Sequence, residues 1–388
     1  MTTRLLTGAT GFVGGAIALE LLDRTQDQLV ALVRGQSADH ARTRLHDGLT
    51  SMAVGYARPD LVPAILQRST AVVGDITEAG CGVDLSSLPE IDEVWHCAAS
   101  LRYEEKYRTE IEAQNIGGTA NMLGLARNLG AGTVNYFSTA YVVGSRRGLV
   151  PEEPATDLEQ TNNCYEESKV RAESLVRSAG EDVRIRILRP SIVIGHPVTR
   201  HGLNWSGMYG FARQTQVFRN IASRKLGTFL NHARVQLLAE PECPINLVPI
   251  DMVARNAVTV CLSDSPETYF HLVNSETIPV RDAVCEIMGL IGLREPRWVD
   301  DRDGFTSIDE ALDDGMDFYR SYLRNGKQFG HGNTDAVCGA GASAAVIDRA
   351  EIAAYVGYFL RQQKGHAEDS GADRIVHLSA SGASGAQL

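Results

Sequence analysis

The chain has 388 residues, of which 44% are hydrophobic and 22% are charged, and its net charge is −11. This composition is typical of a globular protein with one large core or two smaller ones, and the acidic balance argues against nucleic acid as a partner. The seven cysteines form no C-x-x-C pair, so we expect reduced thiols and no metal site. The sequence shows no signal peptide and no run of about 18 apolar residues, which predicts a cytoplasmic protein that binds no membrane.

Strand-like and helical segments alternate along the first half of the chain. Strands are predicted around Leu5 and at 29–33, 71–73, 93–96, 133–137 and 185–188, with a later strand at 269–273. Helices with apolar residues three and four positions apart are predicted at 15–22, 115–129 and 167–177. This alternation predicts an α/β fold built on a doubly wound parallel Rossmann sheet.

A glycine-rich turn joins the first predicted strand to the first helix. Three glycines spaced by two residues let the backbone turn sharply and approach a pyrophosphate, while the helix N-terminus favours the phosphate charge. The spacing differs from the commoner G-x-G-x-x-G, but its place in the first strand–helix turn predicts a dinucleotide site. The candidate cofactor-binding residues here are Thr7, Gly8, Thr10, Gly11, Phe12, Val13 and Gly14.

After residue 195 the alternation gives way to helical, loop and aromatic segments. We assign residues 1–195 and 245–274 to the dinucleotide-binding Rossmann domain, and residues 196–244 and 275–362 to a smaller, mostly helical substrate-binding domain. The acid-rich stretch 294–317 is expected to be an exposed loop and helix. The Gly, Ala, Ser and Asp content of residues 363–388 predicts a disordered tail.

Tyr165 and Lys169 are four residues apart, which places both on one face of a helix. A neighbouring ammonium favours the ionised form of a phenol, and we expect it to make Tyr165 a better proton donor to a developing oxyanion. Thr139 closes the strand at 133–137, where its hydroxyl can donate to a carbonyl oxygen, and Ser138 is the less favoured alternative. Together with the glycine turn, these residues predict a catalytic set for hydride transfer, the alternative being an exposed helix pair.

These motifs together resemble the extended short-chain dehydrogenase/reductase superfamily over roughly residues 3–275. The resemblance also includes Gly74-Asp75-Ile76, His96-Cys97-Ala98-Ala99-Ser100, Asn115 with 117–119, Arg189-Pro190-Ser191 and 248–251. It implies that Asp75 contacts adenine, that the turn at Ala98 lies along the cofactor, and that Thr139, Tyr165 and Lys169 are the catalytic set. The cofactor site implied by this resemblance adds Asp75, Ile76, Ala98, Ala99, Ser100, Asn115, Tyr165, Lys169, Pro190, Ser191 and Val193.

Within the superfamily, the chain is most similar to the thioester reductase and fatty acyl-CoA reductase branch, the male sterility type. The similarity lies in the segments 138–142 and 99–103, and in 189–193 with Gly195. It implies reduction of an acyl thioester to an aldehyde, which a second hydride could carry to an alcohol. The sequence contains no adenylation domain, carrier domain or long C-terminal extension, so we expect the thioester to arrive in trans.

The residue that ends the second strand bears on the cofactor. A carboxylate there would bond the ribose 2′-hydroxyl and repel a 2′-phosphate, whereas this chain has Arg34. Arg44 resembles a second phosphate-binding position of the thioester reductase branch, and a guanidinium suits phosphate well. We therefore expect NADPH, with NADH as the alternative if both arginines are solvated.

Charge is distributed unevenly along the chain. Residues 183–239 contain no Asp or Glu but nine Arg and Lys, a local charge of +9 that leaves −20 for the rest. Such a segment could receive an acidic carrier protein or the phosphates of coenzyme A, although a nucleotide sugar would suit it equally and solvated arginines are the alternative. In the same region Asn204, Trp205, Met208, Tyr209 and Phe211 are weaker candidates for an acyl pocket, since such residues more often belong to the core.

Three functions fit the sequence. The first is an NADPH-dependent reductase of a small-molecule acyl thioester, bound to coenzyme A or to a carrier protein. The second is a ketone reductase, or a nucleotide-sugar epimerase or reductase, with the same Thr139, Tyr165 and Lys169. The third is a non-catalytic binding protein, which the intact catalytic set disfavours. The acyl chain, the extent of reduction and a homo-oligomeric state stay open.

Overall fold

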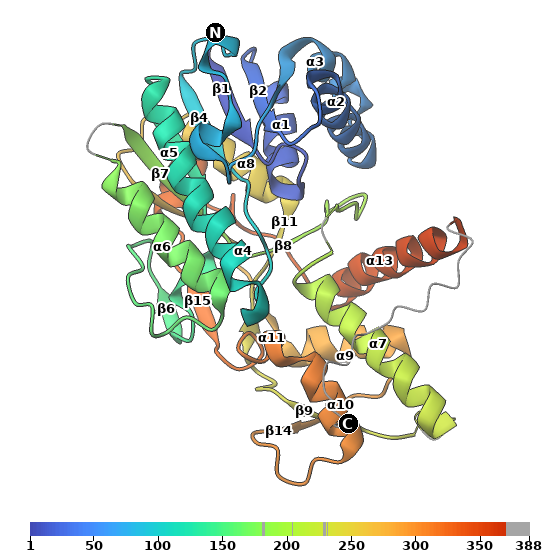
Figure 1. Ribbon diagram of the computed structural model, residues 1–388. Helices are drawn as coiled ribbons and strands as arrows, with labels where there is room; N and C mark the ends of the chain where they lie inside the picture. The colour runs from blue at the N-terminus through green and yellow to red at the C-terminus, as the bar shows by residue number, and fades with distance from the viewer. Residues whose placement is uncertain (181–182, 204, 228–229, 231, 370–388) are drawn as a thin grey trace, which may run out of the picture.

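The structure is a computed structural model that describes residues 1–180, 183–203, 205–227, 230 and 232–369. Its main sheet has seven parallel strands in the order β12-β7-β5-β4-β1-β2-β3. Figure 1 labels β1, β2, β4 and β7 of this sheet. These strands are β1 (Thr3–Thr7), β2 (Gln28–Val33), β3 (Ser69–Val73), β4 (Glu93–His96), β5 (Thr133–Phe137), β7 (Arg184–Pro190) and β12 (Tyr269–Leu272). The strand order reverses beside β1, and ligands of such sheets bind at the carboxyl ends of the strands on either side of that point. The predicted Rossmann sheet is confirmed.

Helices cover both faces of this sheet because successive strand residues point to opposite sides. Leu6 packs in the cluster that contains α1 (Phe12–Arg24), α2 (Ala38–Gly55) and α8 (Ile250–Cys261). Its neighbour Leu5 packs in the other cluster, with α5 (Gly118–Asn128) and α6 (Cys164–Ser178). The shorter helices α3 (Val62–Arg68) and α4 (Arg108–Glu112) complete these layers.

A second, mostly helical lobe has its own apolar core. The core lies among α7 (Met208–Leu226), α9 (Val280–Ile291), α10 (Ser307–Gly315) and α13 (Arg349–Asp369), which Figure 1 shows below the sheet. Short strand pairs lie outside the main sheet: β8 (Ile192–Ile194) with β11 (Leu247–Pro249), β9 (Gln236–Leu238) with β14 (Arg297–Val299), β10 (Pro244–Ile245) with β13 (Ile278–Pro279), and β6 (Gly148–Val150) with β15 (Lys327–Phe329). Two short helices follow in the chain: α11 (Asp317–Arg320) lies beside α10, whereas α12 (Gly332–Cys338) packs against α8 and β12 of the Rossmann sheet. None of the helices in the described ranges has the length and apolar character needed to cross a bilayer.

The predicted elements differ from the observed ones mainly at their ends. Helix α6 begins at Cys164 because the Asn163 side chain caps it, accepting from the Glu166 N–H at 3.0 Å. The acid-rich stretch contains strand β14, which forms only through its pairing with β9. Helix α2 was not predicted. Helix α13 is anchored by buried apolar residues such as Ile352 and Phe359 and continues to Asp369, so the expected tail is helical from 363 to 369, and its remainder lies outside the described residues.

Candidate active site

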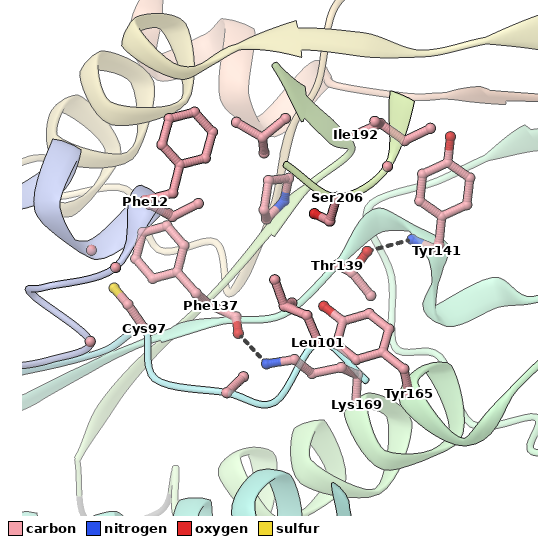
Figure 2. Close-up of a pocket in the computed structure, with 18 of the residues that line it drawn as sticks. Phe12, Cys97, Leu101, Phe137, Thr139, Tyr141, Tyr165, Lys169, Ile192 and Ser206 are labelled. Atoms are coloured by element: carbon pink, nitrogen blue, oxygen red, sulfur yellow. Dashed lines mark hydrogen bonds between the residues drawn. The ribbon is translucent and has the colours of Figure 1, made fainter. Parts of the chain in front are cut away.

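A cavity of about 630 Å³ opens at the carboxyl ends of β1, β2, β4, β5 and β7 and continues between α7 and α9. Figure 2 shows the part of it around Tyr165 and Lys169. The sequence-predicted catalytic and cofactor-binding residues line this cavity, except Ser100 and Asn115. Residues from strands far apart in the sequence are thereby brought to one place. The cavity runs from the glycine turn, past Tyr165, into the helical lobe.

The glycine turn packs closely against its own backbone and against Ala98 only because it lacks side chains. Gly8 has a φ of +75°, and a Cβ there would lie 2.8 Å from the Ala98 nitrogen. A Cβ at Gly14 would lie 2.3 Å from the Gly8 carbonyl oxygen. The Gly11 N–H donates to the same oxygen at 2.8 Å and closes the turn before α1. The bare backbone at the start of a helix fits a pyrophosphate.

Two arginines line the dinucleotide-binding part of the cavity at its other end, away from the glycine turn. Arg34 follows β2 and is exposed, and the guanidinium of Arg44 on α2 donates to the Arg34 carbonyl oxygen. The neighbouring Arg42 is paired with Asp39 at 2.8 Å, whereas Arg34 and Arg44 form no ion pair within the described residues. Two uncompensated guanidinium groups at the end of β2 fit a phosphate better than a bare ribose hydroxyl.

A chain of hydrogen bonds fixes the strands beneath the cofactor portion. The Ala98 N–H donates to the Thr7 hydroxyl at 3.1 Å, and that oxygen lies 2.8 Å from His96 Nδ1. His96 Nε2 lies 3.2 Å from the Thr119 hydroxyl, which donates to the Asn115 carbonyl oxygen at 2.6 Å. Burial lowers the pKa of His96 to about 3, so the ring is neutral. The donors are then consistent only if Nε2 carries the hydrogen, and His96 has a structural role.

Ser100 and Asn115, predicted to bind the cofactor, lie behind the cavity wall. The Asn115 amide oxygen accepts from the Ser100 N–H at 2.7 Å. Its nitrogen donates to the Ser100 carbonyl oxygen at 3.1 Å and to the Ser168 hydroxyl at 2.9 Å. These bonds use the donors and acceptor of the amide, so Asn115 braces the loop after β4 against α6.

Lys169 is held firmly inside the site. Its ammonium donates to the Phe137 carbonyl oxygen at 2.8 Å and to the Tyr136 hydroxyl at 3.3 Å. Burial lowers the pKa of Lys169 to about 8. Burial also raises the pKa of Tyr165 well above its ordinary value, with a smaller contribution from Glu166. The expected lowering of the Tyr165 pKa by Lys169 was wrong, because burial of the phenol raises that pKa and the Lys169 ammonium donates to Phe137 and Tyr136 instead; Tyr165 is protonated.

Two hydroxyl groups follow β5 into the same region. The Thr139 oxygen accepts from the Tyr141 N–H at 3.2 Å, which leaves its hydrogen free to donate. Figure 2 shows Thr139, Tyr165 and Lys169 gathered in one part of the cavity. The Ser138 hydroxyl is buried without a hydrogen-bond partner among the described residues and also lines the cavity. Ser138 is therefore a second available donor.

The helical end of the cavity was only partly foreseen. Met208 and Phe211 line it, whereas Tyr209 and Trp205 pack in the core of the lobe and Asn204 lies outside the described residues. Leu101, Tyr103 and Tyr141 also line it and stand in the segments that carry the family resemblance. Further lining residues were not predicted from the sequence, namely Ala283, Val284, Ile287, Phe318, Tyr319 and Tyr322. The aromatic residues at 318, 319 and 322 could have indicated this part of the pocket. The acidic stretch just before them favoured the interpretation as an exposed segment.

Comparison with known proteins identifies the family to which the chain belongs. A family model described as male sterility protein matches residues 6–257. The chain belongs to the male sterility protein family. The resemblance to the extended short-chain dehydrogenases/reductases is thereby confirmed, and membership supports an oxidoreductase with an NAD(P)-binding Rossmann domain.

The curated proteins similar to this chain include longer proteins. D-lysergyl-peptide-synthetase subunit 3 of Claviceps purpurea is 31% identical over 51% of this chain and 11% of its own length. Fatty acyl-CoA reductase wat of Drosophila melanogaster is 27% identical over 76% of this chain and 59% of its own length. The chain thus spans less than two thirds of either relative. The terminal R domain from the myxalamid PKS-NRPS pathway shares the fold, with a TM-score of 0.71, 24% identity, and coverage of 94% of this chain and 92% of that one.

Proposed function

We propose that this protein is an NADPH-dependent reductase that converts an acyl thioester, bound to coenzyme A or to a carrier protein, into an aldehyde or alcohol. The observation that carries the proposal is the continuous cavity: a dinucleotide cradle at one end, Thr139, Tyr165 and Lys169 in the middle, and an apolar pocket beyond. A fatty acyl-CoA reductase and a peptide synthetase among the relatives support thioester chemistry.

When bound, NADPH supplies the hydride that reduces the carbonyl carbon. Thr139 and Tyr165 donate hydrogen bonds to the carbonyl oxygen, and the protonated Tyr165 transfers its proton to that oxygen as the C–H bond forms. Lys169, one helical turn from Tyr165, stabilises the phenolate that results. The product is a thiohemiacetal. Its C–S bond then breaks while the hydroxyl proton passes to sulfur, which releases a thiol and an aldehyde.

The preference for NADPH rests on Arg34 and Arg44. Both guanidinium groups line the cavity at the end of β2. A cofactor whose pyrophosphate binds at the glycine turn would place its 2′-phosphate there. Asp75 lines the cavity at the end of β3, where one oxygen of its carboxylate accepts from the Thr77 N–H and hydroxyl and neither oxygen pairs with Arg34 or Arg44 within the described residues. It therefore does not neutralise the arginines through a direct ion pair.

The basic segment supports delivery of an anionic carrier. Five of its nine cations are held by intrachain acids or carbonyl oxygens, namely Arg184, Arg186, Arg189, Arg200 and Arg234. The other four, Arg213, Arg219, Arg224 and Lys225, lie on α7 and form no ion pair within the described residues. They are available to an acidic carrier protein or to the phosphates of coenzyme A.

The test is an assay with NADPH and matched octanoyl substrates. Octanoyl-CoA, an octanoyl carrier protein, 2-octanone and a nucleotide sugar are compared by loss of reduced-cofactor absorbance and by product analysis. We expect octanal or octanol from the thioesters, and turnover of the ketone alone would reject the proposal. The variant Tyr165→Phe should lose about 10²- to 10⁴-fold in kcat. Tyr107→Phe, at a tyrosine outside the cavity, is the matched control.

A further inference from the structure

The part of the cavity beyond Tyr165 is uncharged. The charged side chains among the described lining residues are Arg34, Arg44, Asp75 and Lys169, and all four lie at the dinucleotide end or beside Tyr165. Burying an ionised group without a partner is strongly unfavourable. The diphosphate of a nucleotide sugar, or a substrate ending in a carboxylate or ammonium group, would find no counter-charge from these residues.

One side of this region is a continuous set of rings, here called the aromatic wall. Tyr103 stacks on Phe318 with ring centroids 3.8 Å apart, and Phe318 contacts Tyr319 at 5.0 Å and Tyr322 at 5.2 Å. Tyr141 contacts Tyr322 at 4.8 Å, and Phe211 contacts Tyr319 at 5.6 Å. The aromatic wall consists of Tyr103, Tyr141, Phe211, Phe318, Tyr319 and Tyr322. It joins the Rossmann domain to the helical lobe.

Two phenols of the aromatic wall keep their hydroxyl groups away from the cavity. The Tyr322 hydroxyl donates to the buried carboxylate of Glu166 at 2.9 Å, and Glu166 does not line the cavity. The Tyr319 hydroxyl occupies space that Gly210 leaves open, since a Cβ on Gly210 would lie 2.2 Å from it. These two rings therefore present carbon to the cavity. Aliphatic side chains of α9, namely Ala283, Val284 and Ile287, line it as well.

We propose that this region is the acyl subsite, that it takes an uncharged apolar acyl group, and that it rejects acyl groups ending in a carboxylate or ammonium. The inference rests on the proposed function in one respect, the delivery of an acyl thioester to Tyr165. Burial of alkyl or aryl surface against the aromatic wall supplies the affinity, and the lack of counter-charge supplies the discrimination.

The test uses ligands that cannot be reduced, so that it does not depend on turnover. S-octyl-N-acetylcysteamine, a thioether, is compared with its counterpart bearing a terminal carboxylate on the same chain, by titration calorimetry on the full chain with NADP⁺ present. We expect the neutral ligand to bind at least about 100-fold more tightly. Equal affinities would overturn the acyl subsite. A selective subsite in a protein that fails to reduce octanoyl thioesters would instead refute only the proposed function.

Matched glycine variants locate the subsite. Gly210→Ala pushes on the Tyr319 hydroxyl, and we expect it to weaken binding of the octyl ligand about tenfold while leaving NADP⁺ affinity unchanged. Gly289→Ala, on exposed helix α9 surface with nothing within 4 Å of its Cβ position, is the control and should bind as the parent does. Unchanged octyl binding in Gly210→Ala, with the parent's NADP⁺ affinity, would contradict the placement of the subsite at Tyr319.

Discussion

Tyr322, from the helical lobe, donates its hydroxyl hydrogen to the carboxylate of Glu166, and Glu166 directly follows Tyr165 on α6. The bond is 2.9 Å long and the Glu166 side chain is fully buried. Its second oxygen accepts from the backbone and side-chain nitrogens of Asn162 at 2.8 and 2.9 Å. The Glu166 carboxylate thus links α6, which carries the proposed acid Tyr165, to Tyr322 of the aromatic wall.

Removing this bond should destabilise the protein. Tyr322→Phe keeps the ring but leaves one buried Glu166 oxygen without its donor, which costs about 1–3 kcal/mol of unfolding free energy. Urea denaturation measures the change. Tyr107→Phe, whose hydroxyl makes no hydrogen bond within the described residues, should stay within about 0.5 kcal/mol of the parent. Equal stability of the two variants would show that the Tyr322 bond contributes little.

The pKa of Lys169 predicts a pH limit on the proposed reaction. Burial lowers its pKa to about 8, so the group is charged below about pH 8 and neutral above. If the charge stabilises the Tyr165 phenolate, kcat/KM should fall as pH rises through about 8, and Lys169→Met should be slow and lack this limb. His96 is neutral across this range and does not titrate there. A kcat/KM profile that is flat from pH 7 to 9.5 would contradict the assigned role.

Cofactor choice should depend on Arg34 and Arg44, which form no ion pair within the described residues. Arg34→Ala and Arg44→Ala each remove a cation from the proposed 2′-phosphate position, and we expect KM for NADPH to rise about tenfold in each while KM for NADH is unchanged. Arg42→Ala is the control, because Arg42 is already paired with Asp39. An equal rise in KM for both cofactors would mean that the two arginines do not bind the 2′-phosphate.

A buried ion pair joins β7 to α6. Arg189 and Glu173, 0% and 1% exposed, form two hydrogen bonds of 2.8 and 2.6 Å. Glu173→Gln leaves the guanidinium charge uncompensated and should cost about 3–5 kcal/mol of unfolding free energy. Arg171→Gln breaks only the half-exposed pair with Glu167 and should cost less than about 1 kcal/mol. Denaturant unfolding of both variants distinguishes them, and equal losses would contradict the ranking.

The Rossmann sheet was predictable because its signals are local. Strand periodicity located β4 and β5 with the observed bounds, and the glycine spacing placed the turn at Gly8 before α1. The i, i+4 relation of Tyr165 and Lys169 survives any packing of α6, because helix geometry alone fixes it. The sequence by itself thus determined the fold class, the place of the dinucleotide turn and the shared helix face of the proposed catalytic pair.

Only the tertiary structure decided the environments of these groups. Burial by packed neighbours raises the pKa of Tyr165, contrary to the lowering expected from Lys169. The packing of the loop after β4 likewise places Asn115 behind the cavity wall, where it bonds to Ser100. Tyr103 and Phe318 are more than 200 residues apart in sequence, yet they stack in one wall. No periodicity encodes such a contact, because it depends on how two separately formed layers meet. The proposed acyl subsite therefore depends on how the Rossmann domain and the helical lobe pack together.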